Sequence, residues 1–204
     1  MINKFYHPSS EKKMPFFIVI DGTDGCGKDT QAYLLARRLL EQNQRVMLRI
    51  HPSKVLFGRI TKRGLEKGGK AFVLVATVFF ILDVLWSWKF YFKKDFDSIV
   101  FVRYLMATAY LPGKLIRTGY LFFASFLPVP DLAIYLDVRP EISMERITDR
   151  GGKLEEFETR AKLEKKRRKM SLLAREFDWK TVDGNGTIEE VFKKVNDALE
   201  TAIS

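Results

Sequence analysis

The amino-acid sequence predicts an α/β fold with a three-layer α/β/α architecture, in which helices cover both faces of a five-stranded parallel sheet. The main observation is that short, continuously apolar segments of strand length alternate with segments of helical periodicity. Continuous apolar strands are typical of a parallel sheet that is buried on both faces. The chain has 204 residues, of which 47% are hydrophobic and 29% charged, so the composition suits a globular domain and excludes predominant disorder.

The individual elements follow from local patterns taken in chain order. Five apolar segments have the length of strands, and they lie at 15–21, 45–50, 98–103, 131–138 and 179–182. Helical spacing is found at 29–42, 140–149, 155–177 and 188–202. Thr187 is expected to cap the last of these helices, with Glu189 and Glu190 in its first turn.

The most apolar stretch of the chain, at 71–92, allows two interpretations. Its uninterrupted part covers 71–82, and apolar runs of roughly 10–14 residues are more often buried core helices than membrane spans. Asp83 follows directly, and an aspartate in the middle of a bilayer costs about 2.5–3.5 kcal/mol. We therefore expect a core helix that also forms a dimer face, with Trp86 and Trp88 on it, and keep a membrane span as the alternative.

The segment GTDGCGKDT at 22–30 fits the phosphate-binding pattern G-x-x-x-x-G-K. It stands directly after a predicted strand and directly before a predicted helix, as a P-loop must, so that backbone N–H groups and the helix N-terminus face the phosphates. This predicts the P-loop NTPase fold, with a phosphate site formed by Gly22, Thr23, Asp24, Gly25, Cys26, Gly27, Lys28, Asp29 and Thr30. A glycine-rich turn without ligand is the alternative. Cys26 is either a small residue that fits the loop or a thiol activated by the helix N-terminus.

The residue after the P-loop lysine departs from the usual pattern. That position normally carries a serine or threonine hydroxyl for Mg²⁺, whereas here Asp29 occupies it and Thr30 follows. A carboxylate can bind Mg²⁺, so Asp29, Thr30 and Asp21 are the candidate metal ligands. Asp137, at the end of a later strand, is a further carboxylate near the same edge. Asp21 and Asp137 could instead cap the turns that follow them.

Three blocks of the chain resemble the thymidylate kinase family of nucleoside monophosphate kinases over 15–204. They are FFIVIDGTDGCGKDTQ, PDLAIYLDVRPEISMERITDRGG and VDGNGTIEEVFKKV, and they occur in the family's order and spacing. The resemblance implies a P-loop kinase with a helical lid at about 150–170, a homodimer, and the cofactors ATP and Mg²⁺. It also implies transfer of the ATP γ-phosphoryl group to a nucleoside monophosphate, dTMP in the family reaction.

The resemblance also implies roles for individual residues. The acceptor is expected to contact Asp24, Lys54, Phe80 and Arg103, with Phe80 stacking on its base and Lys54 and Arg103 holding its phosphate. The catalytic cations are expected to be Lys28, Arg103, Arg150 and Arg160.

The chain departs from the family pattern at several site positions. Val102 replaces the aspartate of the Asp-Arg-Tyr/His motif, and Val84 replaces the arginine that reads the thymine edge. Glu155 and Glu156 stand where the lid usually has Asp-Arg, and Gly25 stands where some members have a P-loop arginine. Two alternatives follow: a nucleotide-binding relative with weak or absent catalysis, and a kinase with a changed acceptor.

The net charge of +10 requires an anionic partner, and more than half of it lies between Arg150 and Arg175. This basic segment is either a solvated helix face or a lid that closes on ATP phosphates, and it lacks the interleaved aromatics of a nucleic-acid surface. We therefore expect nucleotides as partners, and neither nucleic acid nor a membrane. A single cysteine and the absence of a signal-peptide pattern predict a cytoplasmic protein, with a polar arm at 1–14 and one domain at 15–204.

Overall fold

The computed structural model describes residues 14–52, 70–92, 95–149, 151 and 159–204. Within these segments no helix combines the length and the apolar character needed to cross a membrane. Lys54, Arg150, Glu155 and Glu156, and most of the arm at 1–14, lie outside the described residues.

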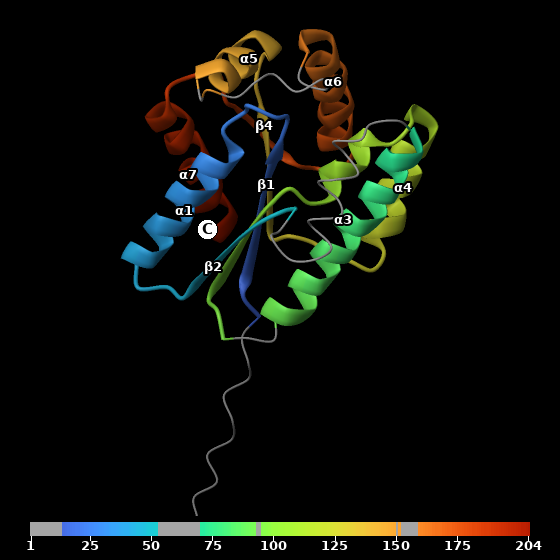
Figure 1. The fold of residues 1–204 in the computed structure, drawn as a ribbon. Coiled ribbons are helices and arrows are strands. Elements are labelled where there is room, and N and C mark those ends of the chain that lie inside the picture. Colours follow the sequence, from blue (N-terminus) through green and yellow to red (C-terminus); the bar gives the residue numbers. More distant parts are fainter. Residues whose placement is uncertain (1–13, 53–69, 93–94, 150, 152–158) are drawn as a thin grey trace, which may run out of the picture.

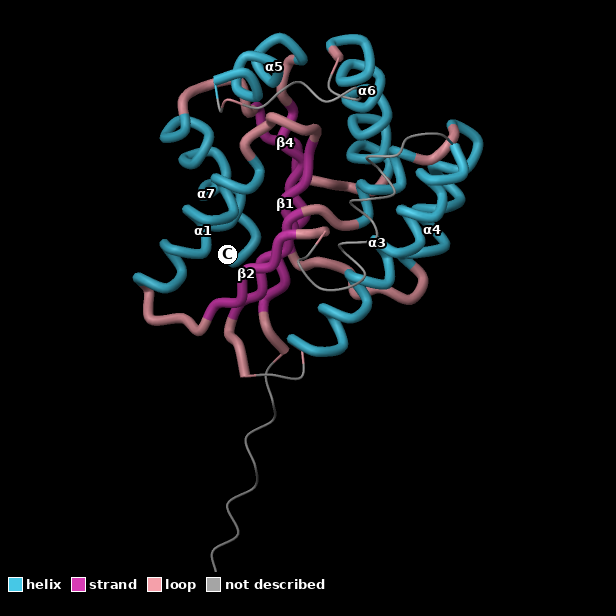
Figure 2. Tube along the Cα trace, viewed as in Figure 1, coloured by secondary structure: helices cyan, strands magenta, loops and turns pink. Residues whose placement is uncertain are grey.

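The centre of the molecule is a five-stranded sheet in which every pair of neighbouring strands is parallel. Its strand order is β2-β3-β1-β4-β5, and the strands lie side by side in Figure 2. Each predicted strand is confirmed within one residue at either end, as β1 (Phe16–Gly22), β2 (Val46–Ile50), β3 (Ser98–Val102), β4 (Leu132–Asp137) and β5 (Lys180–Asp183).

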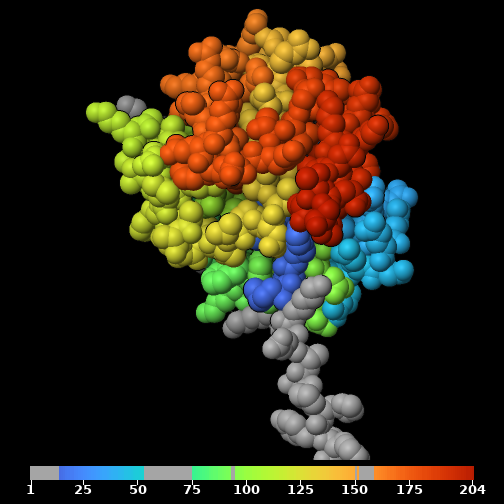
Figure 3. Space-filling view, turned by 180° about the vertical axis from the view of Figure 1, so that it is seen from behind, coloured from blue at the N-terminus to red at the C-terminus, as the bar shows by residue number. Residues whose placement is uncertain are grey.

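Helices cover both faces of this sheet, which confirms the three-layer architecture (Figure 1). One face packs against α1 (Lys28–Glu41) and α7 (Ile188–Ile203). The other packs against α3 (Lys70–Tyr91), η1 (Leu105–Tyr110), α4 (Ile116–Ala124) and α6 (Arg160–Glu176), with the short η2 (Gly113–Leu115) between η1 and α4. Seen from behind, the C-terminal part of the chain, in orange and red, covers much of the upper molecule (Figure 3).

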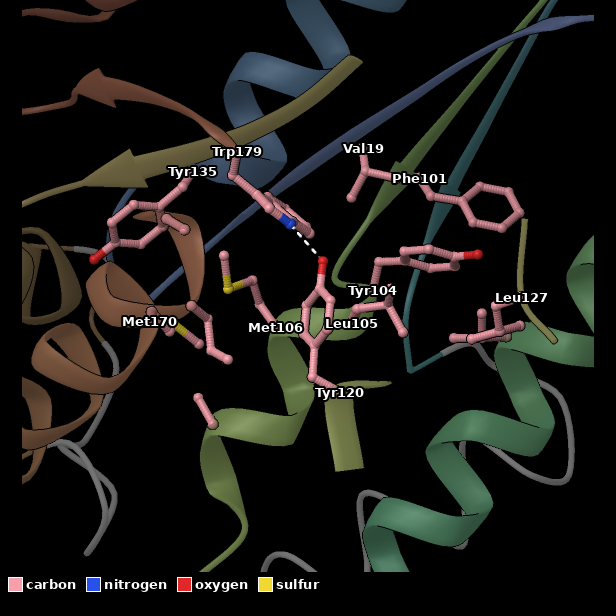
Figure 4. Close-up of a cluster of buried hydrophobic side chains, with 14 of the residues drawn as sticks. Val19, Phe101, Tyr104, Leu105, Met106, Tyr120, Leu127, Tyr135, Met170 and Trp179 are labelled. Carbon is pink, nitrogen blue, oxygen red and sulfur yellow. Dashed lines mark hydrogen bonds between the residues drawn. The ribbon is translucent and has the colours of Figure 1, made fainter. Parts of the chain in front are cut away.

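Alternation along β1 explains why two separate apolar cores form. Phe17 and Val19 point toward the α3 and α6 side, whereas Ile18 and Ile20 point toward α1 and α7. In the first core the indole nitrogen of Trp179 donates a hydrogen bond of 2.7 Å to the hydroxyl of Tyr120, as Figure 4 shows.

The predicted helices are all present, with one-residue differences at several ends and one larger difference at the start of α6. α5 (Pro140–Asp149) has the predicted bounds, and Thr187 caps α7 through a capping box with Glu190. The predicted helix 155–177 is observed as α6, which begins at Arg160 because Thr159 has the extended backbone of an N-cap residue. The stretch at 71–92 is the helix α3, which buries Ala76, Phe80 and Val84 against the sheet and leaves other apolar residues exposed.

Candidate active site at the P-loop

The loop between β1 and α1 has the backbone conformation of a phosphate cradle. Gly25 and Gly27 have left-handed φ values of 78° and 89°, which other residues rarely adopt. A Cβ atom on Gly25 would lie 2.5 Å from the backbone oxygen of Ser143 in α5. No side chain fits at this position without moving α5, so this structure has no room for the arginine that some family members carry there.

Lys28, the first residue of α1, turns back into the loop. Its ammonium group donates a hydrogen bond of 2.9 Å to the carbonyl of Thr23, and the residue is 3% exposed. The lysine is therefore positioned at the centre of the loop, as in a P-loop before nucleotide enters. Cys26 is fully buried beside it, and burial raises the pKa of its thiol, so the structure favours a packing role over an activated thiol.

The carboxylate of Asp24 is the meeting point of three cations from different elements. Its oxygens lie 3.9 Å from Lys28 Nζ, 3.5 Å from Arg103 Nη2 and 3.1 Å from Lys166 Nζ. The hydroxyl of Tyr110 also donates to it at 3.2 Å. Burial acts to raise the pKa of Asp24, but the three cations together hold it well below its usual range. Asp24 is therefore ionised at neutral pH.

Arg103 follows β3 with a left-handed φ of 62°, an uncommon conformation for a residue other than glycine. Its guanidinium donates to the carbonyl of His51 at 3.1 Å and lies 3.7 Å from Asp29 as well as 3.5 Å from Asp24. These contacts aim the side chain across the carboxyl ends of β1 and β3. In open α/β sheets this edge is where ligands bind.

Asp21, at the end of β1, binds backbone amides with both of its oxygens. They accept hydrogen bonds of 2.8 Å from the N–H groups of Gly22 and Tyr104. Asp21 is 1% exposed, and burial raises the pKa of its carboxyl group. Of the two interpretations made from sequence, this geometry corresponds to the capping role, and it also ties the P-loop to the segment that follows β3.

Part of the basic segment faces inward along α6, and sequence reasoning singled out different members of it. Arg160 is exposed and paired with Glu141, whereas Lys166 reaches Asp24 and Lys169 donates to the carbonyls of Ala109 and Leu111 at 3.0 and 2.9 Å. The spacing of Leu163, Met170 and Leu173, all buried, is the signal that could have identified Lys166, because it marks the face of α6 that turns inward.

Two further arginines connect the strand ends around the loop. Arg167 binds Asp137 through two hydrogen bonds of 2.6 and 2.8 Å, which hold the pKa of that carboxyl group below its usual value. Arg146 of α5 donates to the carbonyls of Cys26, Gly184 and Gly186 and so joins the P-loop to the turn before α7. Sequence reasoning missed Arg146, and no local pattern would have identified it.

The remaining candidate positions differ in accessibility. Asp29 is half-exposed and Thr30 is exposed at the start of α1. Phe80 is 5% exposed in the core, with its ring centre 6.1 Å from that of His51. Val84 and Val102 are completely buried in the two apolar cores, so both departures from the family pattern are accommodated by aliphatic packing.

The sheet is parallel and has the strand order β2-β3-β1-β4-β5. A glycine-rich loop with its lysine connects the central strand to a helix. These two features together define a P-loop NTPase fold. Residues 20–195 match the family model described as thymidylate kinase.

Curated relatives agree with this match over nearly their whole lengths. A probable thymidylate kinase from Pyrobaculum aerophilum is 30% identical over 192 residues, covering 92% of this chain and 97% of that protein. One from Pyrococcus abyssi is 31% identical, covering 88% and 93%, and a thymidylate kinase from Leptospira interrogans is 28% identical, covering 95% and 98%. The chain belongs to the thymidylate kinase family, a class of nucleoside monophosphate kinases.

Proposed function

We propose that the protein transfers the γ-phosphoryl group of ATP to dTMP, yielding ADP and dTDP. The observation that carries this proposal is the convergence of Lys28, Arg103 and Lys166 on the carboxylate of Asp24, directly beside the P-loop. Phosphoryl transfer depends mainly on positioning and on stabilising negative charge, and this cluster supplies cations where phosphates would meet. Family membership favours this reaction over a nucleotide-binding protein without catalysis.

The donor is assigned to the P-loop. The backbone N–H groups of 22–30 and the N-terminus of α1 would hold the ATP phosphates, and Lys28 would bridge the β- and γ-phosphates. This assignment is supported by the left-handed glycines and by the position of the Lys28 ammonium group against the carbonyl of Thr23. Lid roles for Arg150 and Arg160 stay predictions.

The acceptor is assigned to the opposite side of Asp24. Arg103 would bind the acceptor phosphate, because its guanidinium is held at this edge by the carbonyl of His51 and is only partly exposed. Asp24 would face the acceptor sugar. Lys54 as a second phosphate ligand stays a prediction, and Phe80 could stack on a base only if its ring becomes accessible.

The residues at the start of α1 fit a Mg²⁺ ion better than Asp21 does. Mg²⁺ is usually bound by one or two protein oxygens together with substrate phosphates, and Asp29 and Thr30 offer accessible oxygens beside the loop. Asp21 is buried and each of its oxygens accepts a backbone amide, so Asp29 and Thr30 are the more accessible ligands, and metal binding by Asp21 stays a prediction. Mg²⁺ held by Asp29 and Thr30 would neutralise phosphate charge during transfer.

We also propose a cytoplasmic homodimer that associates through α3. Five exposed apolar residues form one stripe along this helix, and they are Val75, Val78, Leu82, Trp86 and Phe90. A second copy would bury this stripe. Sedimentation is expected to give a dimer for the natural protein and a monomer for Leu82→Glu; a monomeric natural protein would contradict the proposal.

An ADP-release assay with ATP and Mg²⁺ tests the reaction. The protein is incubated separately with dTMP, dUMP, dCMP, dGMP and AMP, and Lys28→Met serves as the inactive control. We expect dTMP to give the highest turnover. If no acceptor raises ADP release above that of Lys28→Met, the proposed reaction is wrong; if another acceptor exceeds dTMP, the assignment of the acceptor is wrong.

A further inference from the structure

The outward side of α4 and of the turns that flank it carries large apolar side chains that are exposed to solvent. They are Leu115, Leu121, Phe122 and Phe126, and Phe122 is exposed by 62%. The rings of Phe122 and Phe126 contact each other, with their centres 5.2 Å apart, and both also contact the ring of Phe123. Single exposed apolar residues are ordinary, but a contiguous group of them marks an interaction surface.

The segment around α4 contains cations and no acidic residue. Its sequence has no aspartate or glutamate from 98 to 130, whereas Lys114 and Arg117 stand at the start of α4. Arg117 and Leu121 are four residues apart and therefore lie on the same side of the helix. Cations thus border the apolar group at its N-terminal end.

The exposed side of α6 continues this surface. The side chain of Arg117 pairs with Glu176 at the end of α6, and the ring of Tyr120 stacks on that of Phe177, so α4 lies against this end of α6. Figure 3 shows α6, in orange, beside the yellow-green segment that contains α4. Exposed residues recur along α6 at helical spacing, among them Lys165, Arg168, Leu172 and Arg175. We call the outward residues of 114–126 and 164–176 the α4–α6 surface.

The cations of the α4–α6 surface outnumber its acidic groups. Two of them are paired with glutamates of α6, Arg117 with Glu176 and Arg168 with Glu164. Three others form no ion pair within the parts of the chain that the structure describes, and they are Lys114, Lys165 and Arg175. The surface therefore presents unbalanced positive charge beside an apolar group, which is complementary to a partner that is both anionic and apolar.

We propose that the α4–α6 surface binds the face of an anionic membrane, with no segment crossing the bilayer. The phenylalanine and leucine side chains would enter the boundary between headgroups and acyl chains, while the cations would lie at the lipid phosphates. The leucines favour lipid over nucleic acid, because bases stack on flat aromatic rings and gain little from aliphatic side chains. This partner differs from the expectation made from sequence, which considered a membrane only for the stretch at 71–92.

Binding at this surface is independent of the proposed phosphoryl transfer. The candidate active site contacts the other side of α6, where Lys166 reaches Asp24. A variant of the α4–α6 surface therefore tests membrane binding without removing a residue assigned to ATP or to the acceptor.

The test is sedimentation of the full chain with lipid vesicles. One set of vesicles is phosphatidylcholine alone, and the other contains about one third phosphatidylglycerol, each at low salt and at about 0.5 M NaCl. The apolar variant is the double substitution Phe122→Ser and Phe126→Ser, and the charge variant is Lys114→Gln with Arg175→Gln. Leu172→Glu, at a position exposed by 66%, is a second apolar variant on the other helix.

The controls change the opposite face of the sheet. Tyr33→Ser removes an exposed aromatic ring from α1, and Lys193→Gln removes an exposed cation from α7. Thermal unfolding shows which variants fold. Sedimentation without vesicles gives the oligomeric state, and binding of a short single-stranded oligonucleotide is measured for the natural protein and for the apolar variants.

We expect the natural protein to bind the anionic vesicles at least about tenfold more strongly than the neutral ones at low salt. The apolar variants should lose at least about tenfold in affinity for the anionic vesicles at both salt concentrations. The charge variant should lose about ten- to thirtyfold, and only at low salt, because salt screens its contribution. The two controls should stay within about twofold of the natural protein, since neither residue lies on the α4–α6 surface.

Three results would overturn the proposed membrane contact. The first is equal binding of the natural protein to neutral and anionic vesicles, and the second is unchanged vesicle binding by the folded apolar variants. The third is a different occupant of the same surface. A dimer that becomes a monomer in the apolar variants would show a second copy of the chain there, and oligonucleotide binding lost in those variants would show a nucleic-acid site.

Discussion

Two glycines of the P-loop allow the effect of backbone conformation to be separated from the effect of a steric clash. Both have left-handed φ values, 78° at Gly25 and 89° at Gly27. Their surroundings differ, because a Cβ on Gly25 would lie 2.5 Å from the carbonyl oxygen of Ser143, whereas the nearest atom to a Cβ on Gly27 is Arg146 Nη1 at 3.9 Å. Alanine at either position therefore introduces the same backbone strain, but only alanine at position 25 also introduces a steric clash.

The expected free energies follow from these distances. Placing an L-residue in the left-handed region costs about 1–2 kcal/mol, so Gly27→Ala should lower Tm by roughly 2–8 °C for a chain of this length. Gly25→Ala carries the same strain and must also displace the backbone of α5. Overpacking of this kind costs about 1–3 kcal/mol more, which gives a total decrease in Tm of roughly 4–20 °C.

The assay is thermal unfolding of the ligand-free protein, followed by circular dichroism. Without nucleotide, the comparison reports on the folded structure alone and not on phosphate binding. The larger decrease is expected for Gly25→Ala. If the two variants melt within about 1 °C of each other, the close approach of α5 to Gly25 does not limit the size of the residue at this position.

Three further predictions concern buried groups. Burial lowers the pKa of His51 to about 4 from its ordinary value of 6.5. As the pH falls, this histidine therefore binds a proton in the unfolded chain before it does so in the folded protein. The free energy of unfolding should decrease between pH 6.5 and 4 by up to about 3 kcal/mol. His51→Phe should remove this part of the pH dependence in urea unfolding, and an unchanged slope would contradict the reasoning. Tyr120→Phe leaves the buried indole N–H of Trp179 unpaired and should decrease the free energy of unfolding by about 1–3 kcal/mol; a decrease below about 0.5 kcal/mol would mean that the hydrogen bond contributes little. Cys26, at 1% exposure and with its pKa raised by burial, should react with a chromogenic thiol reagent only in denaturant, and rapid labelling of the native protein would show that the loop opens.

The elements predicted most accurately are those determined by neighbouring residues. The five strands are apolar runs that any helix-covered parallel sheet requires, and each was located within one residue. Thr187 caps α7 as expected, and the structure adds a capping box with Glu190, which stands three positions further on. The P-loop was predicted for the same reason, because its glycines and Lys28 act within one short segment.

Predictions about the site were weaker where the partners lie far apart in the chain. The sequence predicted that Asp24 faces the acceptor, but it did not predict which cations contact its carboxylate. Lys166 is 142 residues away from Asp24 in the chain, and Arg103 belongs to a different element. Among ten basic residues between 150 and 175, composition could not indicate which ones point inward. That choice depends on how α6 packs, with Leu163 and Met170 buried and Arg160 left in solvent.

The sequence by itself determined the fold class, the position of the phosphate loop and the family, because periodicity, glycine placement and motif spacing are local properties. Only the tertiary structure decided which charges meet. In the folded chain both oxygens of Asp21 accept hydrogen bonds from backbone amides, and Lys166 contacts Asp24. Arg146 binds carbonyls both of the P-loop and of the turn before α7. Electrostatic and hydrogen-bond partners depend on distances of a few ångströms, and these distances exist only once the layers have packed.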